Sequence, residues 1–282
     1  MTLRLTEINR YPVKSCGAVP EQRAMVDACG LAGDRRWMLV DDDGAQLTAR
    51  EYPRLLGVAV DDSGDGLLLR HPDAEPLRVA SPVAAPRVPV RIWRNEVEAA
   101  LADDEAHAWF SKVAGVPARL VHLADPTQRH PNPSFARPDD TVSFADGYPV
   151  LLTTTDSLDA LNDLIAAGDR ADEGPIPMRR FRPSLVVSGA TAWAEDGWRR
   201  LRIGGAQFRA VKGCDRCVMT VTDPDTGVRG REPLRTLARY RRFGGVSWFG
   251  MNLVPDTPGV MVAVGDDVEV LASEPAPDGP PR

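Results

Sequence analysis

The chain has 282 residues, of which 43% are hydrophobic and 26% are charged, a composition typical of a soluble globular protein of about two domains. Its net charge of -6 argues against a nucleic-acid-binding protein, because phosphate binding favours a basic surface. We expect no membrane span and no signal peptide, since no apolar run approaches about 18 residues and residues 1–15 lack a hydrophobic stretch.

Strand patterns dominate the first part of the chain. Leu3, Leu5 and Ile8 begin an extended opening segment. Residues 37–49 predict a β-hairpin around a turn at residues 41–44, where three aspartates precede a glycine.

Three short helices are predicted among the strands. The first is capped by Asp103 or Asp104 and ends at Gly115. The second is capped by Thr155 or Asp156, carries leucines at helical spacing and ends at Gly168. The third begins at Pro233, because proline suits the first turn of a helix.

A proline-rich stretch separates two predicted domains. Four prolines and few aliphatic residues lie between residues 125 and 140, which predicts a long surface loop near a boundary. We therefore expect an N-terminal domain at residues 1–121 and a second domain at residues 122–272. Residues 273–282 carry four prolines and no large apolar side chain, so we predict a disordered tail.

The segment Cys214-Asp-Arg-Cys217 sets two thiols beside an arginine, before a β-branched run and the turn residues 223–227. We predict that the thiols lie at the start of a strand that continues into a hairpin. Locally, the pair fits half a zinc site, a redox dithiol or two buried thiols. Cys16 and Cys29 form no second C-x-x-C motif, which disfavours structural zinc, and a redox dithiol would open a helix. Four cysteines without a dense framework predict a cytoplasmic location.

Six short motifs follow one another along the chain: Tyr11-Pro-Val-Lys-Ser-Cys16, Thr48-Ala-Arg50, Phe144-Ala-Asp-Gly-Tyr-Pro149, Arg180-Phe-Arg-Pro183, Glu195-Asp-Gly-Trp198, and the segment from Cys214 to Gly227. In this order they resemble MOSC-domain proteins, in particular the branch that includes the mitochondrial amidoxime-reducing component. The resemblance to the C-terminal domain of molybdenum cofactor sulfurase is less close. The resemblance to MOSC-domain proteins spans nearly the whole chain before the predicted tail.

The resemblance implies an α+β, mainly β fold: a MOSC β-barrel core, a β-rich N-terminal MOSC domain and a few short helices. The first residues, about 35 of them, would pack against a site for the molybdenum cofactor, molybdenum bound to molybdopterin. In relatives the second cysteine of the motif ligates the metal, which makes Cys217 the implied catalytic and metal-binding residue. A soft thiolate suits a metal already bonded to sulfur, and we expect Arg216 to favour the ionised thiol. Cys214 is interpreted as a buried or neighbouring thiol.

The cofactor carries a phosphate, for which arginine offers a planar fork, lysine a point charge and serine a hydroxyl. Lys14, Ser15, Arg35 and Arg182 match positions that contact the cofactor in relatives. Asp146 and Gly147 would line the pterin pocket or make a turn before a buried strand at residues 150–152. The full predicted set of cofactor-binding residues is Lys14, Ser15, Arg35, Arg50, Asp146, Gly147, Arg182, Ser184, Asp215 and Arg216.

The implied function is a molybdenum-cofactor-dependent oxidoreductase that reduces N-hydroxylated or other N-oxygenated compounds. Some bacterial relatives append a plant-type iron–sulfur domain, and this chain lacks its cysteines. We therefore expect electrons from a separate donor protein of the ferredoxin, flavodoxin or cytochrome type. The alternative is a non-enzymatic protein that binds the cofactor or a sulfur atom and hands it on.

Overall fold

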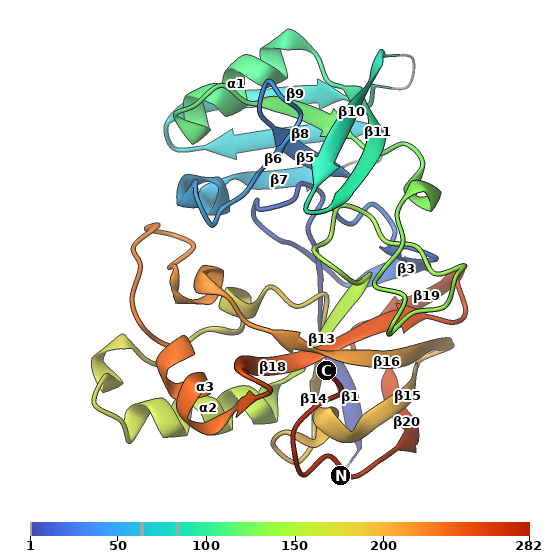
Figure 1. Ribbon diagram of the computed structural model, residues 1–282, viewed down its shortest axis with the longest axis vertical. Helices are drawn as coiled ribbons and strands as arrows, with labels where there is room; N and C mark the ends of the chain where they lie inside the picture. The colour runs from blue at the N-terminus through green and yellow to red at the C-terminus, as the bar shows by residue number, and fades with distance from the viewer. Residues whose placement is uncertain (1, 63–64, 83–84) are drawn as a thin grey trace.

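The computed structural model describes residues 2–62, 65–82 and 85–282, and strands make up most of its regular structure (Figure 1). Three α-helices occur among the described residues: α1 (Asp104–Ala114), α2 (Thr155–Ala166) and α3 (Leu234–Tyr240). The α+β, mainly β class predicted from the sequence is therefore confirmed. None of these helices is long and apolar enough to span a membrane.

A closed barrel of seven strands is formed by the largest sheet of the described residues. In sheet order its strands are β13 (Val150–Thr154), β14 (Leu185–Ser188), β1 (Leu3–Arg10), β20 (Asp267–Ser273), β15 (Trp198–Ile203), β16 (Ala206–Asp215) and β18 (Val246–Pro255), and β18 pairs again with β13. Its interior follows strand periodicity: in β16 Ala206, Phe208 and Ala210 are buried, whereas Gln207 and Arg209 between them are partly exposed. Two short strands pair with the barrel from outside: β2 (Val19–Glu21) is antiparallel to β1, and β17 (Arg242–Phe243) is antiparallel to β18.

The N-terminal half is a separate group of sheets, drawn in blue to green above the barrel in Figure 1. One sheet contains β10 (Arg87–Ile92), β11 (Asn95–Leu101), β12 (Arg119–His122), β5 (Trp37–Val40) and β6 (Gln46–Leu47). A second contains β7 (Ala59–Asp62), β8 (Gly66–His71) and β9 (Ala74–Ala80), and α1 packs between the two through Trp109 and Phe110. A third sheet, β19 (Val260–Ala263), β3 (Arg23–Asp27) and β4 (Gly30–Leu31), joins residues from both ends of the chain.

The predicted elements are confirmed where their patterns are periodic. The opening strand is β1, and β5 pairs with β6 as the predicted hairpin. Asp103 caps α1 by accepting from the backbone N–H of Ala106, and Gly115 ends it at a φ of 76°. The α2 helix begins one residue early, because the hydroxyl of Thr154 accepts from the backbone N–H of Ser157. Helix α3 follows Pro233 as expected.

The prediction of a strand after Cys217 is wrong. Cys214 lies near the end of β16, Cys217 lies just beyond it, and the next residues, Val218–Val221, form a turn of 3-10 helix. Two threonine hydroxyls explain the turn: Thr220 Oγ1 donates to the carbonyl of Cys217 at 2.9 Å, and Thr222 Oγ1 donates to the carbonyl of Val218 at 3.3 Å. The predicted turn at residues 223–227 is present, with Gly227 at a φ of 70°.

The two predicted domains do not separate cleanly in space. Strand β1 belongs to the first 121 residues, yet it lies inside the barrel between β14 and β20 (Figure 1). It therefore joins the second predicted domain, and the boundary at residue 122 stays a prediction.

The predicted disordered tail makes contacts in the structure. The backbone N–H of Gly213 in β16 donates to the carbonyl of Pro281 at 2.9 Å. Pro280 lies so close that a Cβ on Gly213 would come within 2.7 Å of its ring. The tail thus lies against the strand that leads to the thiols.

Candidate functional site

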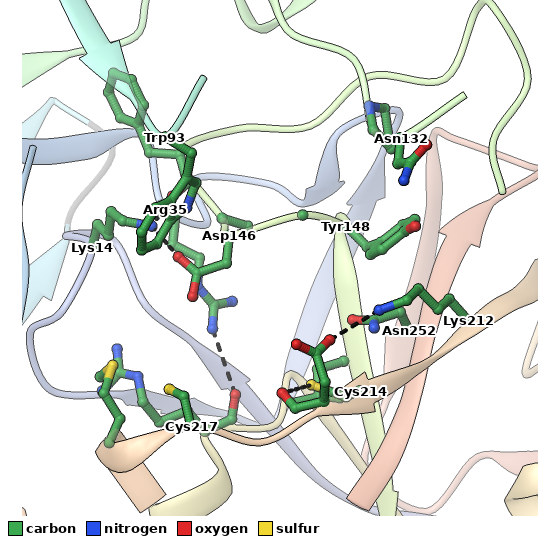
Figure 2. A pocket seen from close by; sticks show the side chains of 18 of the residues that line it. Lys14, Arg35, Trp93, Asn132, Asp146, Tyr148, Lys212, Cys214, Cys217 and Asn252 are labelled. Atoms are coloured by element: carbon green, nitrogen blue, oxygen red, sulfur yellow. Dashed lines mark hydrogen bonds and ion pairs between the residues drawn. The ribbon is translucent and has the colours of Figure 1, made fainter. Parts of the chain in front are cut away.

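A cleft with a volume of about 790 Å³ lies between the barrel and the N-terminal half. Figure 2 shows Lys14, Arg35 and Asp146 on one side of it, Tyr148 and Asn252 on the other, and the two thiols below them. The volume is in the range of small-molecule and cofactor sites. Of the ten predicted cofactor-binding residues, all but Ser184 line this cleft, and so does Cys217.

The cleft concentrates positive charge on a chain that is acidic overall. Its described lining contains nine lysine and arginine side chains and two carboxylates, Asp146 and Asp215. The cations are Lys14, Arg35, Arg50, Arg94, Arg129, Arg180, Arg182, Lys212 and Arg216. Low-dielectric walls focus such a field, so the cleft favours an anionic ligand.

Lys14 and Arg50 share the carboxylate of Asp146. Lys14 Nζ also donates to the carbonyl of Phe144 at 2.9 Å, and Arg50 Nη2 lies 2.8 Å from Asp146 Oδ2. Burial lowers the pKa of Lys14 to about 8, although Asp146 acts in the opposite direction. Burial alone would raise the pKa of Asp146, but the two cations hold it well below its ordinary value.

The shifted pKa of Lys14 makes protein stability depend on pH. Because the folded pKa is about 8 and the ordinary value is 10.5, the unfolded chain binds the proton more tightly, and stability rises with pH between these values. We expect this residue to contribute an increase of about 2 kcal/mol in the free energy of unfolding between pH 7.5 and 9.5. Urea unfolding of the wild type and Lys14→Met at both pH values measures it. A difference between the two proteins that is independent of pH would contradict the assignment.

Each thiol of the C-x-x-C motif has its own arginine. Arg50 Nε donates to Cys217 Sγ at 3.4 Å, and Arg216 Nη1 donates to Cys214 Sγ at 2.7 Å. The expectation that Arg216 assists Cys217 is therefore wrong. Arg50, from the N-terminal half, makes this contact instead. Burial raises the pKa of the Cys214 thiol. Cys217 is half-buried and opens to the cleft.

Arg35 and Arg182 form a second cationic pair around one aromatic ring. The guanidinium carbon of each lies 4.3 Å from the ring centroid of Tyr11. Arg35 is paired with Asp34 at 2.5 Å, whereas no ion pair is made by Arg182 within the described residues. Burial lowers the pKa of Arg182. Its guanidinium is thus available for an anion in the cleft.

Strained backbone is concentrated at this site. Five non-glycine residues have a positive φ in the described part of the chain, and four of them, Ser15, Arg35, Trp93 and Arg182, line the cleft. Such a conformation costs on the order of 1 to 3 kcal/mol for a non-glycine residue and often marks a functional site. At Ser15 the hydroxyl helps to hold the strain, because it accepts from the backbone N–H of Ala49 at 3.1 Å.

Sequence reasoning missed Arg129, which is only 3% exposed. Its guanidinium donates to the carbonyls of Ser143 and Ala145, and Nη2 donates to the carbonyl of Asp146 at 2.8 Å. Burial lowers its pKa to about 10. Arg129 therefore fixes the loop that carries Asp146. Nothing in the proline-rich sequence around Arg129 predicts that this side chain is buried.

Trp93 was also missed, and it lies at the tip of the hairpin between β10 and β11. Its φ is 54° and it is 43% exposed. The next residue but one, Asn95, accepts from Arg129 Nε at 3.3 Å. The hairpin tip therefore contacts the loop of Asp146 as well as the cleft.

Two of the predicted cofactor-binding residues lie where they would not contact a ligand at the centre of the cleft. Ser184 is fully buried behind the cleft, and its hydroxyl lies 3.4 Å from both Arg35 Nη1 and the backbone nitrogen of Leu151. Ser184 can therefore affect a ligand in the cleft only by positioning Arg35. Asp215 lies at the rim, paired with Lys212 at 2.9 Å.

The cleft retains polar atoms that no group in the described chain satisfies. These atoms are Tyr148 Oη, Arg180 Nε and Arg216 Nε. Burial also raises the pKa of Tyr148 to about 12, so its hydroxyl stays protonated at neutral pH. A Cβ on Gly147 would meet nothing within 4 Å, which leaves room for a ligand beside the backbone. Unsatisfied donors, a free cysteine and cations fit a phosphorylated, sulfur-ligated cofactor.

The other cysteines lie elsewhere. Cys16 and Cys29 are buried, and burial raises their pKa values to about 12 and about 11. No cluster of three or more His, Cys, Asp or Glu side chains that could hold a metal ion occurs among the described residues.

The barrel and the β-rich N-terminal half agree with the class that the sequence comparisons show: the chain belongs to the MOSC-domain family. The MOSC N-terminal beta barrel domain matches residues 2–117, and the MOSC domain matches residues 139–269. Mitochondrial amidoxime-reducing component 1 of Homo sapiens is 33% identical over 282 residues, covering 93% of this chain and 81% of that protein. Mitochondrial amidoxime reducing component 2 of Homo sapiens is 35% identical, covering 82% and 70%. Molybdenum cofactor sulfurase of Oryza sativa subsp. japonica is 32% identical, covering 89% of this chain and 32% of that protein.

Proposed function

We propose that the protein is a molybdenum-cofactor-dependent reductase of N-hydroxylated and other N-oxygenated compounds, supplied with electrons by a separate redox protein. The observation that carries the proposal is a cleft in which a half-buried thiol, Cys217, faces nine cationic side chains on an acidic chain. The names of the similar human proteins support reduction of an N-hydroxylated group.

In this proposal the residues of the cleft divide into two tasks. Cys217 ligates the molybdenum, while Lys14, Arg35 and Arg182 bind the phosphate and the pterin by charge-assisted hydrogen bonds. Tyr148 Oη and the free nitrogens of Arg180 and Arg216 gain hydrogen bonds from the bound group.

The cofactor, when bound, supplies two-electron redox chemistry. Reduction of an N–OH group to N–H consumes two electrons and two protons and releases water. The chain contributes binding and orientation, because the strained backbone at Ser15, Arg35 and Arg182 holds its donors in place before the ligand arrives.

A viologen assay tests the reductase. With a chemical reductant that delivers electrons directly, we expect many turnovers of benzamidoxime per molybdenum, and no turnover with NADH alone. Molybdenum and pterin analysis of the same preparation establishes the loading. A loaded protein that gives one equivalent or less with several N-oxygenated compounds would contradict the reductase.

The similarity to a molybdenum cofactor sulfurase favours a second candidate, a carrier of the cofactor or of a sulfur atom. A carrier would transfer its load to an apo-acceptor in proportion to its own loading, without catalytic excess. The transfer assay and the viologen assay on one preparation therefore separate the two functions.

A further inference from the structure

A bulky aromatic residue occupies a backbone position that suits a small one. Ile92 pairs with Asn95, so the loop between β10 and β11 consists of Trp93 and Arg94 alone. The first residue of such a loop often has a positive φ, where glycine or asparagine fits best, and Trp93 has a φ of 54°. Because its side chain is also 43% exposed, burial in a core does not account for tryptophan here.

The indole lies beside two cations, Lys14 and Arg50, and Arg50 also contacts the Cys217 thiol. The guanidinium carbon of Arg50 is 4.6 Å and Lys14 Nζ is 5.8 Å from a Trp93 ring centroid. Both cations bind Asp146, so they lie on one side of the ring. The rest of the indole faces the cleft and solvent. Since Arg50 Nε is 3.4 Å from Cys217 Sγ, the sulfur lies within about 10 Å of the ring.

We propose that Trp93 is a specificity-determining residue: its indole stacks against the planar, conjugated part of the substrate while the N–O group lies toward Cys217. This inference rests on the reductase function proposed above. Offset stacking of two flat π-systems adds a preference of roughly 2- to 12-fold over a saturated ring of similar size.

The experiment compares benzamidoxime with cyclohexanecarboxamidoxime, which carries the same reacting group on a saturated ring. Wild type, Trp93→Phe and Trp93→Asn are assayed with reduced viologen, and kcat/KM is measured for both compounds. We expect the wild type to prefer the aromatic compound by roughly 2- to 12-fold, Trp93→Phe to keep most of this preference, and Trp93→Asn to lose it. The melting temperature of Trp93→Asn should be unchanged or higher, because asparagine accepts a positive φ more readily.

Two outcomes would overturn the inference. An equal loss of kcat/KM for both compounds in Trp93→Asn would show that the indole only holds Arg50 in place. An unchanged preference in Trp93→Asn would show that the ring does not contact the substrate.

A binding measurement separates this inference from the reductase function. Isothermal titration of both compounds into the same three proteins without reductant reports the stacking preference without turnover. Absence of turnover together with a Trp93-dependent binding preference contradicts the reductase and supports the stacking. Turnover without any preference in either assay contradicts the stacking and leaves the reductase intact.

Discussion

We expect Cys217→Ala to abolish viologen-driven reduction, with a loss of kcat/KM of at least about 100-fold. Cys214→Ala should lower kcat/KM by at most about 10-fold. Removing a residue that hydrogen-bonds to a metal ligand typically lowers metal affinity or activity by about 10- to 100-fold. Removing the ligand itself should therefore lower activity further. Both thiols line the cleft, but they have different partners: Cys217 accepts from Arg50 at 3.4 Å, while Cys214 is held by Arg216 at 2.7 Å.

The comparison needs proof that both variants fold. Cys217 is half-buried and accepts one hydrogen bond, so its truncation should leave the melting temperature nearly unchanged. Molybdenum content, melting temperature and kcat/KM are measured for both variants. Equal losses of activity in the two variants, or a fully active Cys217→Ala, would refute the ligand assignment.

Arg182→Met should weaken cofactor retention more than it weakens the fold. A charge-assisted hydrogen bond contributes roughly 1.5 to 3 kcal/mol, so we expect the dissociation constant of the cofactor to rise by roughly 10- to 150-fold. Because Arg182 makes no ion pair within the described residues, its removal leaves no carboxylate unpaired in the protein. Molybdenum content after gel filtration and urea unfolding of the same samples measure the two effects.

Matched variants sharpen this test. Arg78→Met removes an exposed arginine of β9 and should retain all of the molybdenum. Lys14→Ala combined with Arg182→Ala should retain the least, because both candidate phosphate contacts are lost. Unchanged molybdenum stoichiometry in that double variant would remove both residues from the site.

Periodic patterns in the sequence predicted the strands and helices that frame the cleft. Strand β1, the β5–β6 hairpin and the three α-helices follow from apolar spacing and capping residues. The turn after Cys217 was not predictable in the same way. Its β-branched residues favour a strand, and only the hydroxyls of Thr220 and Thr222, bonded to nearby carbonyls, stabilise the alternative.

The contacts across the cleft depend on tertiary structure that no local pattern encodes. Resemblance to the family pointed to Lys14, Ser15, Arg35 and Arg182 as cofactor contacts. The expectation that Arg216 favours the Cys217 thiolate rested only on their closeness in sequence. The structure brings Arg50 to that thiol from 167 residues away. Arg129 and Trp93 were missed because each is fixed by partners from distant loops.

The position of β1 inside the barrel has a consequence for the order of events during synthesis. Strand β1 ends at Arg10, but its neighbour β20 begins only at Asp267, so β1 is synthesised long before its partner. The sheet of β5, β6 and β10 to β12 is complete by residue 122 and can form while the remaining strands are still being made. The barrel, and with it the wall of the cleft that β16 and β18 supply, closes only after β20 has emerged. A nascent chain that has not yet reached β20 therefore has no complete cleft, and we expect a ligand to enter the cleft only after that strand has been made.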